Sequence, residues 1–301
     1  MQSNPTINIS EASRLTGVAA VTLRAWERRY GLVKPSRTPK GHRFYSDDNI
    51  AQIHKIVDWL SRGVKISKVA DLLANDSLPA REETTDTVWQ EAQDELLENL
   101  IALKAQSLNP VLDRLNKSLP FITLCEQVYQ PLHQVLMRRW QNKVLGYQLE
   151  QQLWQQSWQR QLTIMTLRAE KQKSQASIWL INLDQSDQTL DYWLLYSLLL
   201  QANVRVHSIN QLNNMAELSR LEGSPQQSFL LYGNNKLSIN NIVQLSKYTL
   251  SNSQNIFVAG HIVSIHEDVI TDYALKNTIE NIKTFWQSKS FQAWLVPSEL
   301  I

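Results

Sequence analysis

The spacing of apolar residues changes near residue 177, and this change limits the folds open to the chain. Between residues 88 and 173 the apolar residues recur at helical spacing, with interruptions near Asn109-Pro110, Leu119-Pro120 and Gly146. These interruptions predict about four helices in a bundle. Within it, the glutamine-rich run keeps a helical apolar stripe formed by Leu149, Leu153, Trp154, Trp158 and Leu162.

Beyond residue 177, short apolar runs alternate with helical patterns. Strands that alternate with helices form parallel sheets with both faces covered, so we predict a doubly wound α/β domain. The predicted strands are residues 178–183, 204–209, 229–232 and 256–259, and the predicted helices are residues 190–201, 212–221, 239–250 and 270–288.

The N-terminal segment has a different pattern, two short helices separated by a turn. Ser10 is predicted to cap a helix at residues 11–16, and Gly17 to end it. A second helix follows a tight link at residues 18–20, and Leu23, Trp26 and Tyr30 form its apolar stripe. This is the pattern of a helix-turn-helix unit.

The segment after the second helix predicts a basic β-hairpin, or wing. Pro35 and Pro39 exclude a long helix, and Gly41 can supply a turn. We predict that residues 33–34 pair with residues 42–45 as two short strands. Ser46 then caps a helix whose buried stripe is Ile53, Ile56, Val57 and Leu60. Gly63 ends that helix, and another is predicted at residues 68–73.

Basic charge is concentrated in the first quarter of the chain. Residues 1–76 hold 12 Lys and Arg against 7 Asp and Glu, whereas the remainder carries a net charge of −3. A short basic domain joined to a mildly acidic body is typical of a protein that binds nucleic acid. Cys125 is the only cysteine, so an intrachain disulfide is impossible. The sequence also shows no leader-like start and no membrane-spanning apolar run, and we expect a cytoplasmic protein.

The N-terminal motifs resemble those of the MerR family of winged helix-turn-helix transcription regulators. The matching residues are Thr22-Leu23-Arg24, Trp26-Glu27, Arg29-Tyr30-Gly31-Leu32, Pro35, Arg37, Gly41, Arg43, Tyr45 and Asp48. The resemblance implies that the second helix enters the major groove and that the wing contacts the flanking backbone. The alternative for Glu27 is that it pairs with an arginine one turn away and holds it in place, rather than touching DNA. Many members of the family carry a Ser at the link before the second helix; here the residue is Ala19, so one helix cap is lost at a cost of about 1 kcal/mol. The residues implied to bind DNA are Thr22, Arg24, Arg28, Arg29, Lys34, Arg37, Lys40, His42, Arg43 and Tyr45, with Lys34, Arg37 and Lys40 expected at phosphates.

The second half resembles a branch of this family in which a helical bundle and a cobalamin-binding α/β domain follow the DNA-binding domain. In that branch, the bundle carries Trp, nine residues, then Glu-His. Here Trp140 and Glu150 keep the spacing, but Gln151 takes the histidine position. The α/β motif Asp/Glu-x-His-x-x-Gly aligns with Ser186, Gln188 and Asp191. An amide is a poor cobalt ligand compared with imidazole, so we expect no cofactor at these degenerate positions. The other histidines show no metal-ligand spacing, and no metal is expected.

The chain also resembles a narrower type within the family, activators with a degenerate cobalamin-domain scaffold that switch on curli and biofilm-matrix genes. The matching stretches are LRAWERRYGLVKPSRT, GHRFYSDDNI, Ser67-Lys68-Val69 and residues 207–212. We therefore expect a sequence-specific activator that binds double-stranded promoter DNA with RNA polymerase, as a homodimer. The C-terminal region is a possible dock for a signalling protein. The alternative is a ligand-responsive or cobalamin-responsive, light-sensing type of regulator, with a pocket near residues 184–188 and Gly260-His261. An enzyme is not expected, because no paired acid and base motif and no phosphate-binding loop is present.

The expected architecture is therefore multidomain. An all-α winged helix-turn-helix domain is followed by the bundle and then by the doubly wound, cobalamin-binding-like α/β domain. The expected domains are residues 1–76 (DNA-binding), 77–86 (linker), 87–174 (bundle) and 175–301 (α/β).

Overall fold

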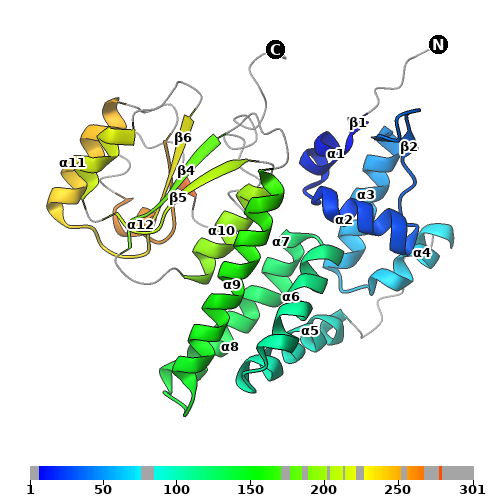
Figure 1. Cartoon of the computed structure of the whole chain (residues 1–301), viewed down its shortest axis with the longest axis horizontal. Helices are drawn as coiled ribbons and strands as arrows, with labels where there is room; N and C mark the ends of the chain where they lie inside the picture. Colours follow the sequence, from blue (N-terminus) through cyan, green and yellow to red (C-terminus); the bar gives the residue numbers. More distant parts are fainter. Residues whose placement is uncertain are drawn as a thin grey trace. The chain divides into compact units, whose positions relative to one another are not determined.

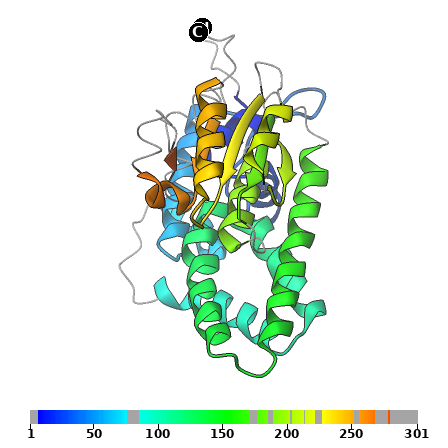
Figure 2. The same cartoon turned by 90° about the vertical axis from the view of Figure 1, so that its left-hand side faces the viewer.

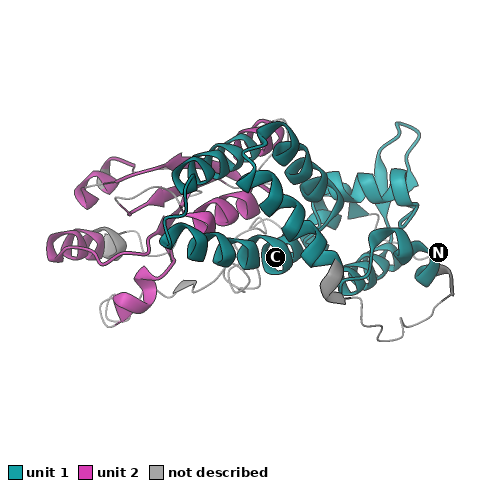
Figure 3. Cartoon of the chain, turned by 90° about the horizontal axis from the view of Figure 1, so that it is seen from below, with its two compact units in different colours: residues 1–161 teal, residues 162–301 magenta. Residues whose placement is uncertain are grey.

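The computed structural model describes residues 7–75, 85–170, 177–184, 189–201, 204–212, 214–221, 227–251, 256–267 and 278–279. The chain divides into two compact units, residues 1–161 and residues 162–301 (Figure 3). This division differs from the expected one, because the DNA-binding region and most of the bundle share the first unit. The boundary falls inside helix α9, Tyr147–Ala169. No helix in the described part of the chain is both long and apolar enough to cross a lipid bilayer.

The first unit begins with a small helical domain that carries a three-stranded antiparallel sheet in the order β1-β3-β2 (Figure 1). The predicted strand at residues 33–34 is wrong. The hairpin instead pairs Ser36 with Phe44 and Arg37 with Arg43, because Val33 is buried in the domain core at 1% exposure. The elements are β1 (Ile7–Asn8), α1 (Ile9–Thr16), α2 (Ala20–Ala25), η1 (Trp26–Tyr30), β2 (Ser36–Arg37), β3 (Arg43–Tyr45), α3 (Asp47–Ser61) and α4 (Ile66–Asn75).

Side-chain caps mark the starts of α1 and α3. The predicted cap of α1 is wrong, because the side chain of Asn8, not Ser10, accepts hydrogen bonds from the backbone of the first turn. Gly17 ends α1 in the left-handed region at φ 68°, as predicted. Ser46 caps α3 in a reciprocal arrangement with Asn49, which confirms the expected start of that helix.

The helical bundle follows, and most of its helix boundaries were predictable. The breaks at Leu119-Pro120 and Gly146 are confirmed, whereas Pro110 lies inside α6. A further break, which the sequence does not predict, lies at residues 102–104, where Leu103 has φ 53°. The elements are α5 (Thr85–Ile101), α6 (Ala105–Ser118), α7 (Phe121–Leu124), η2 (Cys125–Tyr129), α8 (Gln130–Gln141) and α9. Figure 2 shows α8 and α9 joined by a turn at the lower end of the view.

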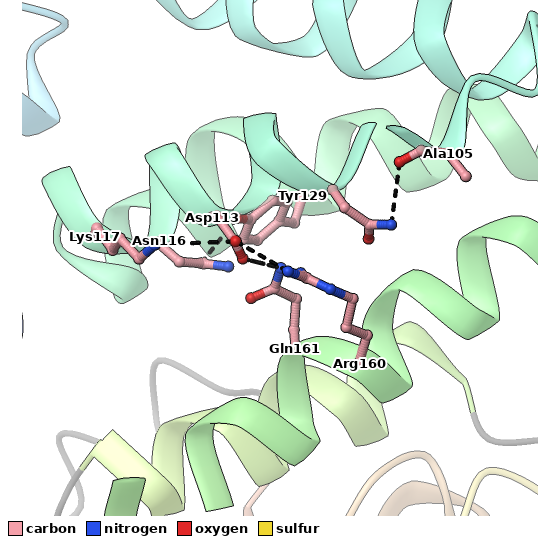
Figure 4. Close-up of polar contacts among 8 residues, drawn as sticks. Ala105, Asp113, Asn116, Lys117, Tyr129, Arg160 and Gln161 are labelled. Carbon is pink, nitrogen blue, oxygen red and sulfur yellow. Dashed lines mark hydrogen bonds and ion pairs between the residues drawn. The ribbon is translucent and has the colours of Figure 1, made fainter. Parts of the chain in front are cut away.

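Polar contacts join α6 to its neighbours (Figure 4). The two terminal nitrogens of the Arg160 guanidinium each donate to the Asp113 carboxylate at 3.1 Å, and the Gln161 amide donates to it at 2.8 Å. Burial disfavours the Asp113 carboxylate, but the hydrogen bonds from Arg160 and Gln161 outweigh burial and lower its pKa. The Tyr129 hydroxyl donates to Asn116 at 2.9 Å. These bonds fix the register of α6 against α9 and η2.

The apolar stripe of α9 is largely as predicted. Trp154, Trp158 and Leu162 are buried, and Leu153 is half-buried. Leu149 is wrong, because its side chain is 59% exposed. The indole rings of Trp154 and Trp158 meet edge to face with centroids 5.9 Å apart. Aromatic packing therefore holds the middle of α9. Leu149 lies in the first turn of this helix, where its side chain is in solvent.

The second unit contains a five-stranded parallel sheet in the order β5-β4-β6-β7-β8. The apolar core on one face packs against η3, α11 and α12. On the other face, Tyr192 of α10 meets Tyr232 of β6 with ring centroids 5.5 Å apart. The sheet is covered on both faces, as a doubly wound domain requires. The elements are β4 (Ser177–Asn182), α10 (Leu190–Gln201), β5 (Arg205–Ile209), η3 (Met215–Leu221), β6 (Gln227–Tyr232), α11 (Ile239–Ser251), β7 (Ile256–Ala259), α12 (Ile262–Ile265) and β8 (Thr278–Ile279).

Two predicted helices of this unit differ from the structure. The helix at residues 212–221 is a shorter 3₁₀ helix, η3. The final helix, residues 270–288, lies outside the described residues except for Thr278 and Ile279, which form strand β8. The four predicted strands are confirmed within one or two residues at each end.

Candidate nucleic-acid interface

The second helix of the N-terminal domain is built in two parts. Its first half, α2, is regular, and its second half, η1, widens into a π-helical turn that ends at Gly31 with φ 63°. π-Turns are rare and frequently occur at functional sites. The helix starts at Ala19 without a side-chain cap, as the sequence predicted.

The apolar side of this helix holds it in the domain core. Leu23 and Trp26 are 1% and 0% exposed, and Tyr30 packs against the same core at partial burial. These positions confirm the predicted stripe. The Trp26 indole also donates a hydrogen bond of 2.9 Å to the carbonyl oxygen of Ser118 in α6. The helix is therefore fixed both within its own domain and to the bundle.

The arginines of this helix lie away from the apolar side. Arg28 and Arg29 are exposed, and Arg24 is half-buried. Because a π-turn repeats over more residues than an α-turn, α-helical spacing alone does not fix the directions of Arg28 and Arg29. Exposed guanidinium groups on a helix that follows a tight link can reach base edges and phosphates.

The wing adds further exposed basic side chains and a well-defined turn. Lys34, Lys40 and His42 are exposed, and their contact with DNA stays a prediction. At the hairpin tip, the backbone N–H of Thr38 donates to the carbonyl of His42 at 2.9 Å. The N–H of Gly41 donates to the carbonyl of Thr38 at 2.8 Å, and Gly41 has φ 81°. A short, hydrogen-bonded tip of this kind presents its basic side chains to solvent.

Glu27 connects the helix to the wing. One carboxylate oxygen accepts from Arg37 at 2.6 Å and the other accepts from Arg43 at 2.5 Å. The expectation that Glu27 pairs with an arginine one turn away is therefore wrong. Burial disfavours the Glu27 carboxylate, but the hydrogen bonds from Arg43 and Arg37 outweigh this effect and lower its pKa.

Two residues predicted to bind DNA are in the core instead. Thr22 and Tyr45 are each 1% exposed, and both hydroxyl oxygens are buried. Burial raises the pKa of Tyr45 to about 12. Tyr45 lies opposite Ile7 in the sheet, so its ring supports the base of the wing. A buried side chain cannot reach a groove, and we remove both residues from the predicted contact set.

Two of the bundle positions that resemble the cobalamin motif, Trp140 and Glu150, are hydrogen-bonded to each other, and Glu150 also pairs with Arg139. Glu150 is 2% exposed and accepts hydrogen bonds from Arg139 at 2.8 Å and from the Trp140 indole at 3.1 Å. Gln151, the next residue, is exposed. The carboxylate is therefore occupied by partners of its own chain. An exposed amide beside it offers no strong cobalt ligand, so these residues do not fit the cofactor.

The carboxyl end of the sheet is similarly occupied by its own polar groups. Asp184 is 4% exposed, and its oxygens accept from the backbone N–H groups of Asn234 and Asn235 at 2.9–3.0 Å. It lies between β4 and β6, where the strand order reverses and α/β domains commonly bind ligands. Asp191 is half-buried in the first turn of α10, and Ser186 and Gln188 lie outside the described residues.

Comparison with known proteins agrees with the geometry of the N-terminal domain. Residues 7–76 match the model for the MerR HTH family regulatory protein. The chain is 37% identical to the HTH-type transcriptional regulator MlrA of Escherichia coli over 128 residues, 42% of this chain and 51% of that protein. It is 38% identical to the Salmonella typhimurium MlrA over the same shares.

A further similarity is to the HTH-type transcriptional repressor CarH of Myxococcus xanthus. The two are 31% identical over 156 residues, 46% of this chain and 50% of that protein. The chain thus spans about half the length of the curated relatives it matches. These relatives are transcription regulators rather than enzymes. The described residues of this chain include no cluster of three or more His, Cys, Asp or Glu side chains that could hold a metal ion. The N-terminal region of this chain is therefore a MerR-family helix-turn-helix domain, and its homologues are MerR-family transcription regulators.

Proposed function

We propose that the protein is a sequence-specific transcription regulator that binds promoter DNA through the second helix and the wing. The observation that carries this proposal is the exposed basic set on both elements. Its members are Arg28 and Arg29 on the helix and Lys34, Lys40 and His42 on the wing. Arg24 and Arg37 are more restricted contacts, because one is half-buried and the other is paired with Glu27.

The biological setting belongs to the same proposal. We propose an activator that works as a homodimer with RNA polymerase in the cytoplasm, on genes of the curli and biofilm-matrix type. The similarity to MlrA, named a transcriptional regulator, supports the part of this proposal that concerns transcription regulation. The similarity to CarH, named a repressor, supports the alternative of a ligand-responsive or cobalamin-responsive regulator. Sedimentation of the full chain tests the dimer, and a monomer at micromolar concentration would contradict it.

The α/β domain is proposed to act as a scaffold without a cofactor, through which the protein pairs with itself or docks a signalling protein. The buried Asp184 network supports this reading, because the described polar groups at the carboxyl end of β4 and β6 satisfy one another. At the same edge, a side chain on Gly260 would lie 2.4 Å from the Gly233 carbonyl oxygen. The backbone that follows β6 and the backbone that follows β7 are thus packed closely together.

A selection experiment tests the DNA-binding proposal. The full chain is used to select duplexes from a random pool, and the enriched duplex is compared with a random-sequence duplex. We expect Arg28→Ala to weaken binding to the enriched duplex by about 1–3 kcal/mol. Lys104→Ala is the matched control, because it removes one exposed positive charge outside the domain. No enrichment by the wild-type chain would refute the proposal.

A further inference from the structure

The second helix and the wing together contain one carboxylate among many cations. Residues 20–45 include seven Lys and Arg residues, and Glu27 is their only acidic residue. A lone negative charge on a surface that meets phosphates opposes binding unless it has a compensating role. Its side chain is only 16% exposed, so the carboxylate is held within the domain rather than directed into solvent.

The partners of Glu27 explain that position. Arg37 and Arg43 lie directly opposite each other across the β2–β3 hairpin. Like charges at directly opposed positions destabilise a strand pair. Glu27 places one oxygen against each guanidinium, at 2.6 Å and 2.5 Å, and so bridges the two strands from the neighbouring helix. One side chain thus relieves the repulsion and ties the wing to the second helix.

The two arginines are held to different degrees. The Arg43 side chain is 18% exposed, whereas Arg37 is 48% exposed and keeps part of its guanidinium in solvent. Arg43 therefore acts mainly as an anchor. Arg37 can still meet a phosphate, but only from the position that Glu27 gives it. Glu27 would then set the distance between the side chains of the second helix that enter the groove and the wing side chains that meet the DNA backbone.

We propose that Glu27 is a positioning residue that gives this domain its sequence selectivity, by locking the wing to the second helix through Arg37 and Arg43. The inference rests on the proposed DNA-binding function. Without the carboxylate, the two arginines become mobile cations that meet the phosphates of any sequence. Non-specific binding then increases while the fixed register that favours the correct sequence is lost.

The test variant is Glu27→Gln in the full chain, which keeps the size of the side chain and removes its charge. Glu11→Gln is the matched control, because the ion pair of Glu11 with Arg14 lies within one helix and, among the described residues, links no second element to it. Both are compared with wild type on the enriched duplex and on a random-sequence duplex over a range of salt concentrations.

For Glu27→Gln, we expect the salt dependence of binding to steepen by about one to two ions. We also expect the preference for the enriched duplex to fall about tenfold. A role confined to folding would change neither the salt slope on the random duplex nor the ratio of affinities. An unchanged slope and ratio would overturn the inference, as would an equal loss of affinity for both duplexes.

A measurement without DNA separates this inference from the proposed function. Hydrogen exchange at the wing amides of Thr38 and Gly41 reports whether the hairpin is held to the helix. We expect these amides to exchange faster in Glu27→Gln than in Glu11→Gln. Equal exchange would show that Glu27 does not hold the wing to the second helix. If wild type enriches no duplex, the proposed function fails, while the exchange experiment still decides whether Glu27 fixes the wing.

Discussion

The ion pair between the buried Glu150 and the partly exposed Arg139 makes a quantitative prediction for Arg139→Met. Arg139 donates three hydrogen bonds of 2.8–3.1 Å to the two oxygens of Glu150. Methionine preserves much of the apolar stem of the arginine but removes every donor. Among the described residues, the carboxylate would then keep the Trp140 indole alone as a partner, at a position that is 2% exposed in the wild type.

The magnitude follows from how deeply each partner is buried. Removing one member of a fully buried ion pair costs about 3–5 kcal/mol. Because the Arg139 side chain is 26% exposed, water already screens part of the attraction. We therefore expect a loss of about 2 kcal/mol in the free energy of unfolding. With a urea dependence of about 2 kcal/mol per molar, the midpoint measured by circular dichroism falls by about 1 M.

The pH dependence provides the stricter check. Hydrogen bonds from Arg139 lower the pKa of Glu150 more than burial raises it. A carboxyl group with a lowered folded pKa stabilises the protein above its unfolded pKa, and this stability is lost as the pH falls through the folded value. The difference between wild type and Arg139→Met should therefore shrink as the pH falls below about 4.

The control is Arg138→Met, which alters the exposed neighbour of Arg139 on the same helix. That variant should unfold within about 0.5 kcal/mol of wild type. An equal loss for both variants would refute the reasoning. So would a loss for Arg139→Met that stays constant into the acid range, because the interaction would then not depend on the Glu150 charge.

Three further outcomes are expected. Arg43→Ala should leave the salt slope of DNA binding within about half an ion of wild type, because Arg43 is paired with Glu27; a slope smaller by about one ion would place it at a phosphate instead. Asp113→Asn should cost about 1 kcal/mol of unfolding free energy at pH 7 and progressively less as the pH falls through the lowered pKa of Asp113. The purified chain should retain no corrinoid absorption band after incubation with cobalamin and desalting, and a retained band would restore the cofactor-dependent alternative.

The parts of the fold set by buried apolar runs were predictable from the sequence. Parallel strands covered on both faces are nearly continuous apolar runs, and β4, β6 and β7 are of this kind. Helix breaks were predictable only where proline or glycine marked them. The chain turns at Leu103 with neither residue present, and it tolerates Pro110 inside α6. Local composition carries no signal for such positions.

The candidate interface was predictable in outline but not in its internal contacts. Helical periodicity identified the buried side of the second helix, because burial depends on the regular repeat of Leu23 and Trp26. The partners of Glu27 lie ten and sixteen residues away, and only the folded hairpin brings them together. Tyr45 illustrates the converse error. The family motif marks it as important, yet its ring supports the wing from the core.

Trp26 gives a final test of how the DNA-binding helix depends on the bundle. Its indole N–H reaches the Ser118 carbonyl, 92 residues away, at the end of α6. Trp26→Phe keeps an aromatic ring but leaves that buried carbonyl without this donor, at a cost of about 1–3 kcal/mol. In the full chain, we expect faster hydrogen exchange in α2 of Trp26→Phe than in α2 of the wild type. A fragment of residues 1–76 lacks Ser118. Its α2 amides should therefore exchange faster than those of a fragment of residues 1–161. Equal protection of α2 in both fragments would show that the second helix is held by its own domain alone.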